Sequence, residues 1–278
     1  MIEAAHRIAA GNPNAVTLCV NGSDINTALE NDRIALVLAL ESAPGIGDDV
    51  ELLETLYRLG IRVASIAHFG RTALADGSCE DGTGSRLTTA GVAALAEMER
   101  LGMIFDLSHL GAAGVDHVLE LATRPLIATH SSARAVFDHH RNLADDQLKA
   151  IGAGGGVIGV NFFAPYLDET EHTVDRLVDH IEHVSTIAGV QHVGLGPDFI
   201  KEVLSDTTPP CCEGQTIDGI PLGSYIPGLE GPAGLPLVTE VMQRRGWRNA
   251  DICAVLGENV SRLFSEWLGI PSESLQCR

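Results

Sequence analysis

The chain has 278 residues, and 18 lysines and arginines stand against 37 aspartates and glutamates, which gives a formal net charge of −19. Such an acidic surface repels phosphate backbones and anionic membranes, so nucleic-acid binding is excluded as the main function. Apolar runs are interrupted well before the roughly 18 residues that a membrane-spanning helix needs, so we expect no transmembrane segment. Length and hydrophobic content fit one large domain or at most two, and we take residues 1–278 as a single domain.

In chain order, the first residues read as the inside of a helix and show no features of a signal peptide. From about residue 34 onward, short β-branched apolar runs alternate with amphipathic stretches of helical period. The predicted strands are 16–20 (the weakest), 34–41, 62–68, 104–109, 126–130, 156–162 and 192–198. The predicted helices are 48–59, 88–101, 114–123, 145–153, 173–188, 237–245 and 249–267.

Strands that alternate with helices indicate an α/β fold in which parallel strands are joined by helical crossovers. Six or seven such units suit a (β/α)8 TIM-like barrel better than a doubly wound sheet, and no G-x-G-x-x-G motif follows a first strand. Residues 204–236 are rich in proline and glycine, and we expect them to form a long functional loop such as a lid over the barrel mouth.

The six cysteines are dispersed, and no C-x-x-C pair occurs among them. A disulfide framework is expected mainly in short secreted domains, so the pattern indicates thiols in a reducing compartment and a cytoplasmic location. Cys211 and Cys212 are adjacent in the proline-rich loop, but no second pair supports a metal site there.

Polar side chains stand at the end of five of the predicted strands. These residues are Glu41, His68, His109, His130 and Asp198. The carboxyl ends of barrel strands converge on the active-site face. A single histidine at such a place is more often structural, but five polar residues at one end are difficult to explain as packing, because each buried polar group needs a partner. Imidazole and carboxylate donors without thiolate suit a hydrolytic zinc ion or a similar divalent ion.

Arg141 follows two histidines in a predicted loop. A guanidinium group is well suited to binding a substrate carboxylate, although a solvated surface arginine explains the sequence equally well. The helical histidines, among them His180 and His183, are predicted to be structural.

Three segments carry a family resemblance: RLGMIFDLSH at 100–109, PLIATHSSAR at 125–134 and RNLADD at 141–146. Together with shorter matches around Glu41 and Asp198, they resemble the membrane dipeptidase (renal dipeptidase) family of zinc peptidases over nearly the whole chain. The resemblance implies a metal-dependent barrel that hydrolyses dipeptides to free amino acids with metal-activated water.

By resemblance, Glu41 is the carboxylate that bridges two zinc ions, and His109 and His130 complete the second zinc site. The family supplies the other site through a His-x-Asp pair on the first barrel strand, and this sequence has no such pair. Either the chain is a shortened version of a dinuclear dipeptidase that lacks the first strand, or it is a divergent member that has lost one metal site and catalysis with it. Three remaining ligands leave room for one zinc ion or none.

The resemblance also implies roles around the substrate. His68 would bind the substrate carbonyl or the tetrahedral oxygen, Arg141 would bind the C-terminal carboxylate of the dipeptide, and Asp198 would deliver a proton to the leaving amine. Two departures near these residues are mild: Phe199-Ile200 follows Asp198 where a second acidic residue is usual, and Ser42-Ala43 replaces glycines after Glu41.

We therefore predict a zinc metallodipeptidase whose partner is a small dipeptide, and a homodimer is left open. The alternative is a non-catalytic family member that binds a dipeptide-like ligand or a partner protein. An amidohydrolase acting on a cyclic amide is less favoured, because Arg141 suits a free carboxylate.

Overall fold

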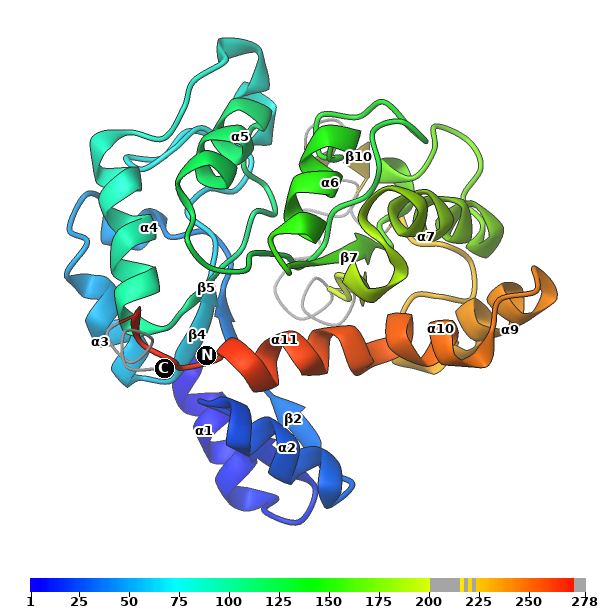
Figure 1. The fold of residues 1–278 in the computed structure, drawn as a ribbon, viewed down its shortest axis with the longest axis horizontal. Coiled ribbons are helices and arrows are strands. Elements are labelled where there is room, and N and C mark those ends of the chain that lie inside the picture. The colour runs from blue at the N-terminus through cyan, green and yellow to red at the C-terminus, as the bar shows by residue number, and fades with distance from the viewer. Residues whose placement is uncertain (201–215, 218–219, 222–223, 273–278) are drawn as a thin grey trace. The chain divides into compact units, whose positions relative to one another are not determined.

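The computed structural model describes residues 1–200, 216–217, 220–221 and 224–272 (Figure 1). Residues 204–215, 218–219 and 222–223 of the predicted lid, with Cys211 and Cys212, lie outside the described residues, as does Cys277. Packing divides the chain into two compact units. The first unit comprises Met1–Ile127, Gly154–Gly156 and Val260–Arg278, and the second comprises Ala128–Ala153 and Val157–Asn259.

The first unit contains five strands, all in parallel pairs. Strand β1 (Val16–Leu18) pairs with β2 (Ile34–Leu36), and β4 (Ile61–Ala64) lies between β3 (Leu38–Leu40) and β5 (Ile104–Phe105). Every residue of β4 is buried, as expected for the central strand of a parallel sheet. The helices of this unit are α1 (Ile2–Gly11), α2 (Gly22–Glu30), α3 (Leu52–Arg58), α4 (Thr89–Leu101) and α5 (Ala112–Leu121), and most of α11 (Asn259–Trp267) belongs to it.

The caps of α4 show how local sequence fixes an element. Thr88 accepts a hydrogen bond from the amide of Gly91 and begins the helix, and Gly102 ends it in the left-handed conformation with φ 81°. Only glycine adopts this conformation readily, so the chain turns here and enters β5 two residues later. The apolar face of α4, which includes Leu95 and Met98, is buried.

The main strands of the second unit are β7 (Val157–Asn161) and β8 (Val193–Gly196). They form a three-stranded sheet in the order β6-β7-β8 with β6 (Ile127–Ala128), of which Ala128 belongs to this unit. Strands β7 and β8 are parallel, and all five residues of β7 are buried. Two short antiparallel strands, β9 (Thr216–Ile217) and β10 (Ile220–Pro221), also belong to this unit. Its helices are α6 (Asp145–Ala153), α7 (Val174–Ala188), α9 (Pro236–Arg244) and α10 (Asn249–Cys253), with a π-helix at Ala254–Glu258.

The predicted order of strands and helices is confirmed, with four corrections. The predicted strand 34–41 is two strands, because β2 pairs with β1 while β3 pairs with β4. The predicted helix 249–267 is broken at Gly257, whose φ of 173° is not helical. Helix α2 was not predicted; it begins at Asn21, whose side chain accepts a hydrogen bond from the amide of Asp24.

The fourth correction concerns the strands that precede His68 and His109. Strand β4 ends at Ala64 and β5 ends at Phe105, so both histidines lie in loops and not at strand ends. After β5 the Asp106 carboxylate accepts a hydrogen bond from the amide of Ser108 at 2.9 Å, which turns the chain out of the strand direction. Among the described residues, no helix combines the length and apolar character needed to cross a bilayer.

Candidate functional site

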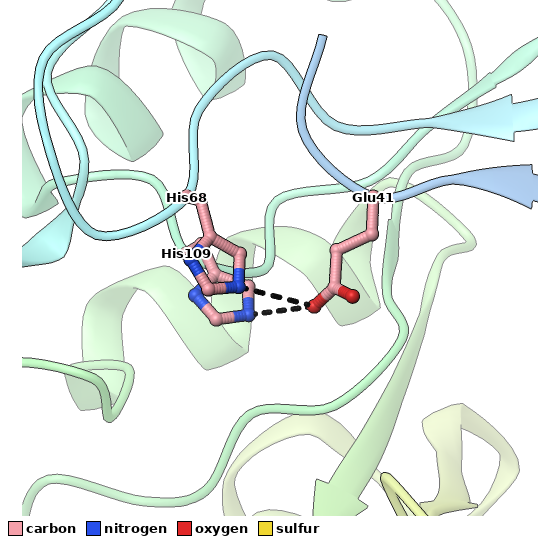
Figure 2. A group of neighbouring side chains, drawn as sticks. All are labelled: Glu41, His68 and His109. Carbon is pink, nitrogen blue, oxygen red and sulfur yellow. Dashed lines mark hydrogen bonds and ion pairs between the residues drawn. The ribbon is translucent and has the colours of Figure 1, made fainter. Parts of the chain in front are cut away.

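Three of the predicted site residues come together in the first unit (Figure 2). Nε2 of His109 lies 2.9 Å from Oε1 of Glu41, and Nε2 of His68 lies 3.7 Å from the same oxygen. The two imidazole rings are stacked with centroids 3.9 Å apart. Two nitrogen donors from separate loops therefore converge on one carboxylate oxygen.

Glu41 directly follows β3, and the turn after it is held firmly. Ser42 has a φ of 63°, which is unfavourable for a residue with a side chain. Its amide donates to Oγ of Ser65 at 2.7 Å, and the amide of Ser65 donates to the carbonyl of Leu40 at 3.0 Å. Backbone strain of this kind persists only where surrounding contacts over-determine it, and here it sets the direction of the glutamate.

His109 is also held in the left-handed region, with a φ of 71°. Its side chain is 4% exposed, whereas the side chains of Glu41 and His68 are 49% and 40% exposed. Phe69 packs edge-on against both imidazoles, with centroid distances of 4.3 Å to His68 and 5.1 Å to His109. The group thus has a buried imidazole at its base and an open side toward solvent.

A cavity of about 710 Å³ adjoins the open side of this group. Glu41 and His68 form part of its wall, and most of the remaining lining side chains are apolar. The apolar lining residues are Leu40, Ala43, Ile46, Leu52 and Leu56, and the others are Ser42, Gly45 and Thr55. The carboxylate and one imidazole are therefore accessible from a space that is mostly apolar.

The donor atoms of this group fit one divalent ion. One ligand atom from each of Glu41, His68 and His109 lies within 4.8 Å of the other two. Two imidazoles and a carboxylate with no thiolate are the donors of many hydrolytic zinc sites, which keep a further position open for water or substrate. The half-exposed carboxylate leaves room for that further position.

The other predicted residues, His130, Arg141 and Asp198, belong to the second unit. Arg141 is 4% exposed, so the interpretation as a solvated surface arginine is wrong. Its Nη2 donates to the carbonyl of His130 at 2.9 Å, and its Nη1 donates to Oγ of Ser131 at 3.0 Å. The guanidinium thereby fixes the backbone that carries His130.

Asn161, at the end of β7, was missed in the sequence, although a polar residue that ends a buried strand is a usable signal. Its Nδ2 lies 3.4 Å from the carbonyl of His130 and 3.5 Å from Oδ2 of Asp198. Asp198 itself has a φ of 54°. Nδ1 of His130 contacts Oγ1 of Thr129 at 2.8 Å, which orients the ring.

His180 on α7 holds the loop that follows His130. Its side chain is fully buried, its Nδ1 accepts from the amide of Ala133 at 3.1 Å, and its Nε2 donates to the carbonyl of Leu167 at 2.9 Å. Burial lowers the pKa of His180 from 6.5 to about 4. The predicted structural role is confirmed for this histidine.

This neutral, buried imidazole predicts that the protein loses stability in mild acid. The unfolded chain takes up the proton near pH 6.5 and the folded chain near pH 4, so the free energy of unfolding falls as the pH decreases between these values. The full loss is about 3 kcal/mol, at about 1.4 kcal/mol per pH unit. Urea unfolding from pH 7 to 4 measures this slope.

The variant His180→Gln should lose that pH dependence, whereas His183→Gln on the same helix should keep it, since His183 is part-exposed and contacts Asp145. An identical slope in wild type and His180→Gln would contradict the assignment.

Comparison with known proteins places these residues in a family. The family model described as membrane dipeptidase (peptidase family M19) matches residues 1–208. The chain belongs to the membrane dipeptidase family. It is 30% identical over 264 residues to dipeptidase verJ of Clonostachys rogersoniana, an alignment that covers 95% of this chain and 63% of that protein. The chain thus spans less than two thirds of the length of this curated relative.

Two solved structures resemble the chain over almost its whole length. An amidohydrolase from Pseudomonas aeruginosa is 26% identical with a TM-score of 0.82, over 97% of this chain and 84% of that one. A metallopeptidase from Rhodobacter sphaeroides, bound to a phosphinate mimic of the dipeptide L-Ala-D-Ala, is 27% identical with a TM-score of 0.80, over 95% and 73%. The predicted α/β fold of the TIM-barrel type is confirmed.

Proposed function

We propose that this chain is a metallodipeptidase, which hydrolyses dipeptides to free amino acids with one zinc ion held by Glu41, His68 and His109. The observation that carries the proposal is the convergence of two imidazole nitrogens on one glutamate oxygen. A bound zinc ion supplies a water of lowered pKa and polarises a carbonyl group. The family resemblance assigns His68 to the substrate oxygen instead, but the position of its Nε2 beside Oε1 of Glu41 supports a role as metal ligand.

The side chains of the group have different tasks in this proposal. Buried His109 supplies its donor nitrogen, Nε2, from the protein side of the group, 2.9 Å from Oε1 of Glu41. His68 is exposed on the cavity wall, so the ion that it holds would face a substrate carbonyl group in the cavity. The mainly apolar cavity suits an uncharged, apolar substrate side chain.

The roles proposed for three residues of the second unit follow the family resemblance. By that resemblance, His130 binds a metal ion, Arg141 binds the C-terminal carboxylate of the dipeptide, and Asp198 passes a proton to the leaving amine. Support comes from the buried, hydrogen-bonded guanidinium of Arg141 and from Asn161, which contacts the Asp198 carboxylate and orients it. The dipeptide mimic bound by the Rhodobacter sphaeroides metallopeptidase supports dipeptides as the substrate class, and a D-residue at the C-terminal side is proposed by family resemblance.

Zinc analysis and a dipeptide hydrolysis assay on residues 1–278 test the proposal together. We expect bound zinc and the release of two free amino acids from an apolar dipeptide. A chain that binds a dipeptide and releases no amino acids would support the alternative, a non-catalytic family member. No bound zinc and no release would contradict the enzyme proposal.

Recognition of the substrate carboxylate gives a separate prediction. Amidation of the dipeptide C-terminus should lower kcat/KM by roughly 10- to 100-fold, because hydrogen bonds to charged groups contribute about 1.5–3 kcal/mol. In the variant Arg141→Lys, kcat/KM for the free acid falls, and amidation has a smaller effect. Equal kcat/KM for acid and amide in the wild type would show that Arg141 supports only the His130 backbone.

We also propose that residues 1–278 function as one domain, since the family match runs from residue 1 to 208 through both units. A cytoplasmic location is proposed from the cysteines, of which Cys19 and Cys253 are free thiols. A homodimer stays a prediction, which light scattering of the purified chain would test.

A further inference from the structure

The segment Asp76–Cys79, here named the 76–79 bridge, ties together the two loops that carry His68 and His109. Four backbone hydrogen bonds make this connection. They run from Gly77 N to Gly70 O (3.2 Å), from Cys79 N to Phe69 O (3.0 Å), from Ser78 N to His109 O (2.8 Å) and from Gly111 N to Asp76 O (3.1 Å). The bridge therefore binds the backbone of His109 itself and the two residues that follow His68.

The bridge also lies unusually close to the backbone of His68. A Cβ atom placed on Gly77 would be 2.1 Å from the carbonyl oxygen of His68 and 2.5 Å from that of Phe69. Real side chains do not approach backbone atoms so closely, so only glycine allows this contact. The sequence around residue 77 thus fits a segment that must pack directly against the His68 loop.

A buried carboxylate anchors the bridge. Asp76 is 6% exposed, and its two oxygens accept hydrogen bonds from Arg71 Nε (2.6 Å), Arg71 Nη2 (2.9 Å) and Thr83 Oγ1 (2.6 Å). The hydrogen bonds from Arg71 are the main reason why the pKa of Asp76 is lowered to about 2. The anchor stays charged over the range in which a hydrolase works, and a bidentate arginine gives it a defined direction.

We propose that Asp76 is a positioning residue: through the 76–79 bridge it holds His68 and His109 in the orientation in which both Nε2 atoms meet Glu41. The part of this inference that concerns metal binding rests on the proposed zinc site. The part that concerns the histidine loops stands on the contacts within the first unit. Supporting groups behind metal ligands typically change metal affinity by about 10- to 100-fold when they are removed.

The test compares Asp76→Asn with a matched control, Glu97→Gln. Glu97 also accepts two hydrogen bonds from one arginine, Arg100, at 2.7 and 2.6 Å. Glu97 and Arg100 both lie on α4, so these hydrogen bonds do not involve either histidine loop. Zinc affinity is measured by competition with a chromogenic chelator, and the visible absorption spectrum of the cobalt-substituted protein reports ligand geometry. We expect zinc binding about 10- to 100-fold weaker and an altered cobalt spectrum in Asp76→Asn, and neither change in Glu97→Gln.

Amide hydrogen exchange of the metal-free protein separates this proposal from the zinc proposal. Asp76→Asn should speed exchange in residues 66–79 and 106–112, and Glu97→Gln should not. If the wild type binds no zinc, the proposed function fails, and these exchange rates still decide whether Asp76 fixes the loops.

If Asp76→Asn does not fold, a second variant at an exposed position, Thr83→Ala, removes the hydrogen bond from the Thr83 hydroxyl to the Asp76 carboxylate. It should weaken zinc binding about 5-fold, the equivalent of one hydrogen bond. The proposal is overturned if Asp76→Asn has the zinc affinity, the cobalt spectrum and the exchange rates of the wild type. Where only Thr83→Ala folds, the same result in that variant overturns it.

Discussion

Replacing Glu41 by glutamine should remove zinc from the site and lower dipeptide hydrolysis by more than about 100-fold, because loss of a direct ligand exceeds the roughly 10- to 100-fold effect of supporting groups. Oε1 of Glu41 is the atom that both imidazoles approach, at 2.9 and 3.7 Å. Glutamine keeps the size of the side chain and loses its negative charge, which the two imidazoles cannot supply.

The measurement is zinc content after dialysis, together with kcat/KM for an apolar dipeptide. Glu54→Gln is the control, since Glu54 lies on α3 in the same unit and forms a surface ion pair with Arg58 at 2.6 Å. Surface pairs of this kind contribute little, so the control should match the wild type. If Glu41→Gln retains as much zinc as the wild type, the ion is held by other residues.

The variant Gly196→Ala should lower the free energy of unfolding by about 3 kcal/mol or more, at the upper end of overpacking effects. A Cβ atom on Gly196 would be 2.1 Å from the carbonyl of Thr129 and 2.8 Å from Cα of His130. These obstacles are backbone atoms, which cannot rotate away, so β8 or the strand that leads to His130 must move. Hydrolysis should fall as well, because His130 shifts with that strand.

Urea unfolding of the two proteins measures the loss. Gly231→Ala is the matched control, because a Cβ there meets nothing within 4 Å and its φ of −167° suits any residue. The control should stay within about 0.5 kcal/mol of the wild type. Wild-type stability in Gly196→Ala would mean that the sheet packs less tightly against residues 129 and 130 than the structure shows.

Elements whose ends carry their own signals could be predicted closely from the sequence. Helix α6 was predicted at 145–153, as observed, and α4 was predicted one residue too long. Each has local chemistry at its start: acidic residues in the first turn of α6 and the capping Thr88 of α4. Such signals need only neighbouring residues, so they can be read without the fold.

Strand ends could not be predicted in the same way. Ile66, Ala67 and Leu107 are each about 1% exposed, yet all three lie beyond the ends of β4 and β5. Their apolar character reports burial correctly, but burial continues into the loops after strand pairing has stopped. The predicted strands 62–68 and 104–109 therefore include loop residues that are packed against the protein.

The residues of the candidate site could be selected from residue types, whereas their supporting contacts could not. Glu41, His68 and His109 could be selected because imidazole and carboxylate recur after apolar runs. The roles of Asp76 and His180 depend on hydrogen bonds to loops that the local sequence does not specify, such as the bond from Ala133 to His180 across 47 positions. Backbone donors and acceptors are the same in almost every residue, so the sequence does not show which of them form these hydrogen bonds.

The most direct test of the central claim is a crystal structure of this chain grown with zinc, with anomalous differences collected at the zinc edge. We predict a peak at bonding distance from Oε1 of Glu41 and from Nε2 of His68 and His109, the atoms that already converge in the structure. A map in which zinc is absent from these three side chains, or lies only at other residues, would contradict the account.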